Sequence, residues 1–105
     1  MNIAIQSRHD EIVVLLQRLF QELSPQLQGY KVVLFGSRAA GRAAPRSDFD
    51  LGVLGAGPLP LKVFYQIEDK LEALPTLYKI DWVDLNRASD DFRQRALEHV
   101  EVLYG

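Results

Sequence analysis

Hydrophobic residues recur along this chain in two rhythms, one typical of helices and one typical of strands. From about Ser7 to Leu23, apolar side chains return every three or four positions with charged residues between them. This spacing predicts an amphipathic helix that ends at Ser24-Pro25. The same spacing predicts a helix from Leu61 to Leu74 and another after Ser89, whose hydroxyl is placed to cap the helix N-terminus.

Three short runs rich in β-branched and aromatic residues predict strands between the helices. They are Tyr30 to Phe35, Asp48 to Leu54 and Tyr78 to Leu85. The last residues, 99–105, either continue the final helix or form a short strand, because their apolar positions also alternate. Strands that alternate with helices predict an α/β fold in which helices pack against one sheet. A length of 105 residues predicts a single domain over residues 1–105.

The composition is that of a globular protein and excludes several kinds of site. The chain has 48% hydrophobic and 25% charged residues, and it contains no cysteine, so disulfides and thiolate metal sites are excluded. A net charge of −2 provides no general attraction to nucleic acid or to an anionic membrane. No apolar signal core opens the sequence and no run reaches the roughly 18 residues that span a membrane. We expect a cytoplasmic protein with no membrane or nucleic-acid partner.

The segment from Leu34 to Val53, LFGSRAAGRAAPRSDFDLGV, carries the strongest indication of chemistry. The strand before it ends in Gly36-Ser37, a turn of small residues that lets a phosphate approach the backbone N–H groups. Ser37 is also expected to cap a short helix. The next strand opens with Asp48-Phe49-Asp50, and its two carboxylates point to one face because strand side chains alternate. Gly52 continues that face and is expected to leave room for a ligand.

A further acid lies in the third predicted strand, within Ile80-Asp81-Trp82-Val83-Asp84-Leu85. Aspartate is depleted in strands, and crowded carboxylates raise one another's pKa unless a cation relieves their repulsion. A site that offers oxygen ligands alone suits Mg²⁺ or Mn²⁺. Asp81 and Asp84 are three positions apart, so a regular strand directs them to opposite faces and only one can join the site.

These residues together resemble the minimal nucleotidyltransferases of the DNA polymerase β superfamily. Gly36-Ser37, ten intervening residues and Asp48-Phe49-Asp50 are similar to the first motif of that family. The later segments KIDWVDLNRASDDFR and VEVLYG resemble its third-carboxylate strand and its C-terminal end. Phe49 stands where the family more often has Ile or Leu. The resemblance implies a polymerase β palm-like fold with a small mixed sheet and helices packed against it.

The resemblance also implies a role for each motif residue. Asp48 and Asp50 would bind two Mg²⁺ ions, with Mn²⁺ as a possible substitute, and Asp81 would complete the site, with Asp84 as the alternative. The implied reaction is attack of an acceptor hydroxyl on the α-phosphate of a nucleoside triphosphate, with release of pyrophosphate. The residues expected near the β- and γ-phosphates are Gly36, Ser37, Arg38 and Arg42, with Arg46 a weaker candidate.

Finally, the resemblance implies a partner, because minimal nucleotidyltransferases of this type pair with small helical proteins of the HEPN group. The leading hypothesis is an Mg²⁺-dependent enzyme that transfers AMP from ATP to a hydroxyl of such a partner and acts as its antitoxin. The alternatives are a binding module that neutralises its partner by contact alone, and a small nucleotide-binding regulator.

Other conspicuous side chains are interpreted as structural. Trp82 is expected in the core rather than as a stacking platform for a base. His9 and His99 lie in helical patterns and are expected to be solvated. Lys79 could approach a phosphate. The phenylalanines expected in the core are Phe20, Phe35, Phe64 and Phe92.

Overall fold

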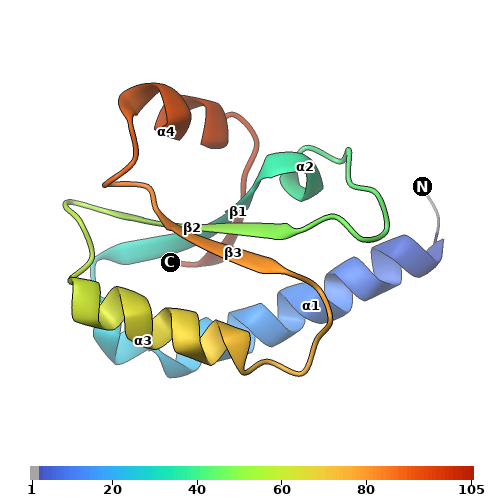
Figure 1. Ribbon diagram of the computed structural model, residues 1–105, viewed down its shortest axis with the longest axis horizontal. Helices are drawn as coiled ribbons and strands as arrows, with labels where there is room; N and C mark the ends of the chain where they lie inside the picture. The colour runs from blue at the N-terminus through green and yellow to red at the C-terminus, as the bar shows by residue number, and fades with distance from the viewer. Residues whose placement is uncertain (1–2) are drawn as a thin grey trace.

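A four-stranded mixed sheet lies at the centre of the computed structural model, which describes residues 3–105 (Figure 1). The strand order is β3-β2-β1-β4, so β3 and β4 form the two edges. β1 pairs antiparallel with both β2 and β4, and β2 pairs parallel with β3. The sheet confirms the predicted α/β fold. The strands are β1 (Tyr30–Phe35), β2 (Phe49–Gly55), β3 (Ile80–Asp84) and β4 (Glu101–Tyr104).

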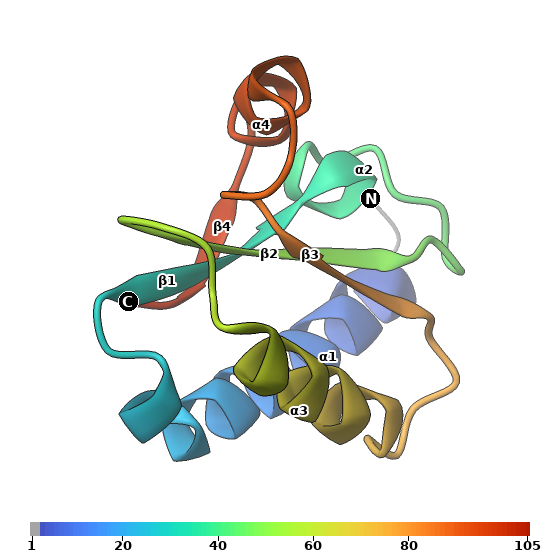
Figure 2. The same ribbon diagram turned by 60° about the vertical axis from the view of Figure 1, so that its left-hand side comes forward.

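Helices cover the two faces of this sheet unequally (Figures 1 and 2). The long helices α1 (Ile3–Glu22) and α3 (Leu61–Glu72) lie together against one face, and α3 provides the crossover that joins the parallel strands β2 and β3. The shorter α4 (Asp90–Ala96) lies on the other face. Two short elements complete the fold: the single-turn α2 (Gly36–Ala39) at the end of β1, and a 3₁₀ turn, η1 (Ser24–Gln26).

The hydrophobic core is divided by the sheet in the same way. The larger cluster lies between the sheet and the helices α1 and α3, and it includes Leu16, Phe20 and Leu51. A smaller cluster on the α4 face joins Val33, Phe35, Leu85 and Ala96. Side chains of β1 enter both clusters because successive residues point to opposite faces, which makes β1 the most deeply buried strand.

Most element boundaries fall within a few residues of their predicted positions. Ser89 caps α4 as predicted, since its Oγ accepts a hydrogen bond from the Phe92 N–H at 3.1 Å. The undecided tail is a strand, β4, paired with β1. The predicted cap at Ser37 is wrong: α2 begins one residue earlier, at Gly36, and has no side-chain cap.

Three further expectations about side chains can be compared with the structure. Trp82 is a core residue as expected, because its ring stacks between Phe20 and Phe64 and its Nε1–H donates to the Phe64 carbonyl at 3.1 Å. Phe92 does not belong to the core, since 38% of it is exposed. His9 is not solvated: its ring packs against Phe49 at 5.6 Å, whereas His99 is exposed.

No helix in the range 3–105 is long and apolar enough to cross a membrane.

Candidate active site

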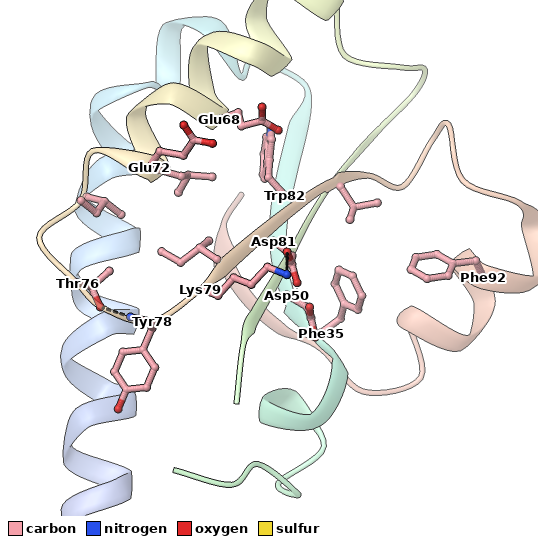
Figure 3. A pocket seen from close by; sticks show the side chains of 14 residues that line it. Phe35, Asp50, Glu68, Glu72, Thr76, Tyr78, Lys79, Asp81, Trp82 and Phe92 are labelled. Atoms are coloured by element: carbon pink, nitrogen blue, oxygen red, sulfur yellow. Dashed lines mark hydrogen bonds and ion pairs between the residues drawn. The ribbon is translucent and has the colours of Figure 1, made fainter. Parts of the chain in front are cut away.

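Asp50 and Asp81 lie directly opposite each other on the parallel strands β2 and β3. Phe35, the last residue of β1, pairs with Asp50 from the other side, so the three residues form one row across the sheet. Because side chains in register point to the same face, the row directs both carboxylates to the α4 side. Figure 3 shows the two acid groups side by side, with the Lys79 amine next to them.

The turn after β1 brings the backbone into contact with one of these carboxylates. Gly36 has φ +75°, and a Cβ built on it would lie 2.3 Å from Asp50 Oδ2. Only glycine provides both the left-handed conformation and the missing side chain at this place. The Gly-Ser turn and the carboxylate strand therefore meet as the sequence predicted.

Crowding changes the acidity of Asp50. Its pKa is raised above the ordinary 3.8, first by burial, then by the charge of Asp81 and hydrogen bonding with it, and then by the charge of Asp48. Lys79 partly opposes this effect, and its Nζ lies 3.6 Å from Asp81 Oδ1. A divalent cation would relieve the repulsion between two carboxylates held together in this way, and oxygen donors suit Mg²⁺.

Asp48 is near this pair but does not complete a three-ligand cluster. The residue is half-buried just before β2, and its charge acts on both Asp50 and Arg38. Within the described part of the chain, no three acidic or histidine side chains converge closely enough to hold a metal ion. The structure thus unites two of the three predicted ligands and places Asp48 beside them.

Asp84 lies in different surroundings from Asp81. Its side chain is on the opposite face of β3 and is buried, with 5% of the residue exposed. Oδ2 accepts from the Leu59 N–H at 2.8 Å, and Oδ1 accepts from the Asn86 N–H at 2.9 Å. Asp84 therefore ties the segment that precedes α3 to the end of β3, and Asp81 is the acid that faces Asp50.

Arg38 was predicted near the phosphates, but its guanidinium is buried against the protein's own backbone. Nε and Nη2 both donate to the Ser47 carbonyl, at 3.0 and 2.9 Å, and the group lies 4.0 Å above the Phe49 ring. Burial lowers the pKa of Arg38, while Tyr78 and Asp48 act in the opposite direction. Ser37 is half-buried within α2, and the side chains of Arg42 and Arg46 are exposed on the following loop.

The space expected at Gly52 is filled by the protein. A Cβ built on Gly52 would lie 2.6 Å from Leu85 Cδ1, because the Leu85 side chain crosses over this part of β2. The sequence pattern correctly places Gly52 on the carboxylate face, but it contains no sign that a residue beyond β3 would cover it. The ligand space lies elsewhere.

A pocket of about 780 Å³ runs along the outer edge of β3 and contains both paired carboxylates (Figure 3). On the α4 side it is lined by Phe35, Asp50, Asp81 and Phe92. On the other side of the strand it continues to α3, where Glu68 and Glu72 line it together with Trp82. These glutamates were not among the predicted site residues, although their spacing of four residues places them on one side of a helix.

Comparison with known proteins finds relatives over most of this chain. Residues 17–105 match the family described as Polymerase beta, Nucleotidyltransferase. The chain is 29% identical over 84 residues to the probable protein adenylyltransferase MntA of Haemophilus influenzae, covering 80% of this chain and 71% of that protein.

Solved structures show the same fold. A structure of a tri-AMPylated Shewanella oneidensis HEPN toxin in complex with MNT antitoxin contains a chain that is 26% identical, with a TM-score of 0.61 over 89% of this chain and 72% of that chain. A mutant of the toxin–antitoxin MntA-HpeT gives 25% identity and a TM-score of 0.63 over 86% of this chain and 72% of that chain.

Proposed function

This chain belongs to the polymerase β nucleotidyltransferase family, and from that premise we propose that it transfers AMP from ATP to a hydroxyl group of a HEPN-type partner. In this proposal the protein is the antitoxin of a toxin–antitoxin pair. The observation that carries the proposal is the pairing of Asp50 with Asp81, in register, on the wall of an open pocket beside Gly36.

The proposed reaction joins the acceptor oxygen, whose hydroxyl proton is released to water, to the α-phosphorus of ATP. It breaks the bond between that phosphorus and the oxygen bridging to the β-phosphate. AMP then remains on the acceptor and pyrophosphate leaves. Mg²⁺, held by Asp50 and Asp81 with Asp48 beside them, would supply positive charge to the triphosphate. Gly36 allows a phosphate to come close to the backbone, and Ser37 and Arg42 are the proposed donors to the β- and γ-phosphates.

The choice of AMP and of a HEPN-type acceptor is supported by the relatives. One is named a probable protein adenylyltransferase, and another is an MNT antitoxin in complex with an AMPylated HEPN toxin. The pocket is consistent with this choice because it is open and follows an edge strand, where a second protein could present a hydroxyl group.

The test is to incubate the purified protein with a HEPN-type partner, Mg²⁺ and ATP labelled at either the α- or the γ-phosphate. We expect label on the partner from α-labelled ATP alone, since the γ-phosphate leaves with pyrophosphate. Asp50→Asn and Asp81→Asn should abolish the transfer. Asp91→Asn is the matched control, because its side chain is 81% exposed on α4 and does not line the pocket.

Binding of the nucleotide provides an independent measurement. Mg²⁺-ATP should raise the melting temperature of the wild type, since a ligand that binds only the folded state stabilises it, and Asp50→Asn should remove this effect. A partner that is still neutralised by Asp50→Asn and Asp81→Asn together, without any label, would instead support the contact-only binding module.

A further inference from the structure

A chain of polar contacts links the three elements α1, α2 and β4 to the loop in front of Asp48. Arg38, on α2, donates to the Ser47 carbonyl through both Nε and Nη2, and Nη2 also lies 3.4 Å from the Pro45 carbonyl. Ser47 immediately precedes Asp48, so this guanidinium holds the backbone at the residue next to a predicted metal ligand. The two donors act as a fork on one oxygen, a geometry that a lysine amine does not reproduce.

The other side of the guanidinium is held by His9 of α1. Arg38 Nη1 lies 3.3 Å from His9 Nδ1, and His9 Nε2 lies 3.6 Å from Glu101 Oε2 on β4. This arrangement suits a neutral imidazole that accepts from Arg38 at Nδ1 and carries its proton at Nε2, toward the carboxylate. The Phe49 ring packs against both Arg38 and His9. Arg38 is therefore fixed from several sides, with 6% of it exposed.

The loop itself depends on this anchor. The loop closes on itself through two local hydrogen bonds: Ser47 N–H donates to the Ala44 carbonyl at 3.1 Å, and Ala44 N–H donates to Ser47 Oγ at 2.8 Å. Arg38 supplies the contacts that tie this small turn to the body of the protein. The loop side chains of Arg42 and Arg46 are exposed, so opening of the turn can be detected by a protease.

We propose that Arg38 is a positioning residue that fixes the loop preceding Asp48, and that His9, held by Glu101, keeps the guanidinium in place. Its effect on catalysis rests on the proposed function, in which Asp48 stands beside the metal-binding pair. The effect of Arg38 on the loop does not depend on the proposed function. The effect on the loop and the effect on catalysis can be measured separately.

The first experiment measures the loop in the protein without nucleotide or metal. Limited trypsin digestion, followed by mass spectrometry, reports cleavage after Arg42 and Arg46. We expect trypsin to cleave the Arg38→Lys variant at these two sites about tenfold faster than the wild type. The reason is that the forked pair of charge-assisted hydrogen bonds is lost while the charge is kept. Arg46→Lys is the matched control, because it makes the same substitution within the loop and keeps a trypsin site at both positions. Trypsin should cleave this variant at the wild-type rate.

Two further variants test the rest of the chain of contacts. His9→Ala should also accelerate cleavage in the loop, by a smaller factor than Arg38→Lys, because His9 contacts the guanidinium that holds the loop. In Arg38→Ala, ethylguanidinium should slow the cleavage again and ethylammonium should not, because only the former restores the planar fork.

The second experiment distinguishes positioning from direct phosphate binding. If Arg38 positions the loop, Arg38→Lys raises the Mg²⁺ concentration needed for half-maximal transfer severalfold while KM for ATP at saturating Mg²⁺ changes little. Equal cleavage of Arg38→Lys and wild type, or a raised KM for ATP with unchanged cleavage, would overturn the proposal. A wild type that transfers no AMP would refute the proposed function alone, since the cleavage rates would still decide whether Arg38 positions the loop.

Discussion

At the scale of single residues, the site depends on how closely the backbone approaches one carboxylate. Gly36 combines a left-handed φ of +75° with the 2.3 Å separation between its ideal Cβ and Asp50 Oδ2. Gly41 provides a natural comparison, because its φ is +73° and a Cβ built there meets no atom within 4 Å. An alanine at Gly41 introduces backbone strain alone, whereas an alanine at Gly36 introduces the same strain and also displaces Asp50.

We expect Gly41→Ala to lower the free energy of unfolding by about 1 kcal/mol through backbone strain alone. Gly36→Ala should lower the free energy of unfolding by roughly 1–3 kcal/mol more than Gly41→Ala, because its methyl group must push the Asp50 carboxylate aside. Urea unfolding measures both values, and the transfer assay should lose activity only for Gly36→Ala. Equal unfolding free energies for the two variants would contradict the close contact.

The raised pKa of Asp50 predicts a pH dependence for the metal-free protein. The folded state keeps the Asp50 proton to a higher pH than the unfolded chain, whose value is near 3.8. Stability linked to this group is therefore fully present below pH 3.8 and is lost as the pH rises through the raised folded-state pKa.

The Asp50→Asn variant has no ionisable group at this position, so it does not lose stability as the pH rises. It should therefore be more stable than the wild type near pH 7 in the presence of a chelator. The gain should be on the order of 1 kcal/mol or less, because water in the open pocket screens the repulsion. It should disappear as the pH falls toward 3.8. Urea unfolding between these two pH values measures the trend, and an Asp50→Asn protein no more stable than the wild type at pH 7 would contradict it.

At the scale of elements, the two faces of β3 have different roles: one carries the candidate site and the other packs into the core. The α4 face carries Asp81 beside Asp50, and the α3 face carries Trp82 in the core and Asp84 on the backbone of neighbouring segments. Just beyond the strand, Leu85 turns back over Gly52 of β2 and closes the sheet surface next to the acids. This contact limits the ligand space to the outer edge of β3.

A double-mutant cycle tests that contact. Leu85 is completely buried, so Leu85→Ala should cost about 2–4 kcal/mol, and Gly52→Ala should cost roughly 1–3 kcal/mol because its Cβ would lie 2.6 Å from Leu85 Cδ1. In the double variant the added methyl group occupies space that the shortened side chain has left. The combined loss, measured by urea unfolding, should fall short of the sum by about 1 kcal/mol, and strict additivity would argue against the contact.

At the scale of the whole molecule, the sheet order explains why the pocket lies where it does. β1 is enclosed by β2 and β4 and buried on both faces, while β3 is an edge with helices on either side. The pocket follows this edge from α4 to α3, so the paired carboxylates lie at an open border of the fold (Figure 3). The same architecture brings the N-terminal helix and the C-terminal strand together at His9 and Glu101.

Local spacing in the sequence was sufficient for most of the elements and for the central motif, but it left the strand β4 undecided. Period-two and period-3.6 patterns, the Gly36-Ser37 turn and the Asp48-x-Asp50 motif are properties of neighbouring residues, so they could be recognised before any pairing of strands was known. Spacing left the partner of Asp50 open between Asp81 and Asp84, and only the resemblance to the nucleotidyltransferases favoured Asp81. The register of β2 with β3 places Asp81 opposite Asp50.

Tertiary structure alone decided where the long polar side chains point and which gaps are filled. Arg38 can reach either a phosphate or the Ser47 carbonyl, and His9 lies 29 residues before it, so neither contact has a signature in local spacing. Leu85 over Gly52 and Glu68 beside the pocket likewise depend on how β3 and α3 pack. The physical reason is that backbone periodicity determines which face a residue occupies, whereas its partners are determined by the packing of segments distant in sequence.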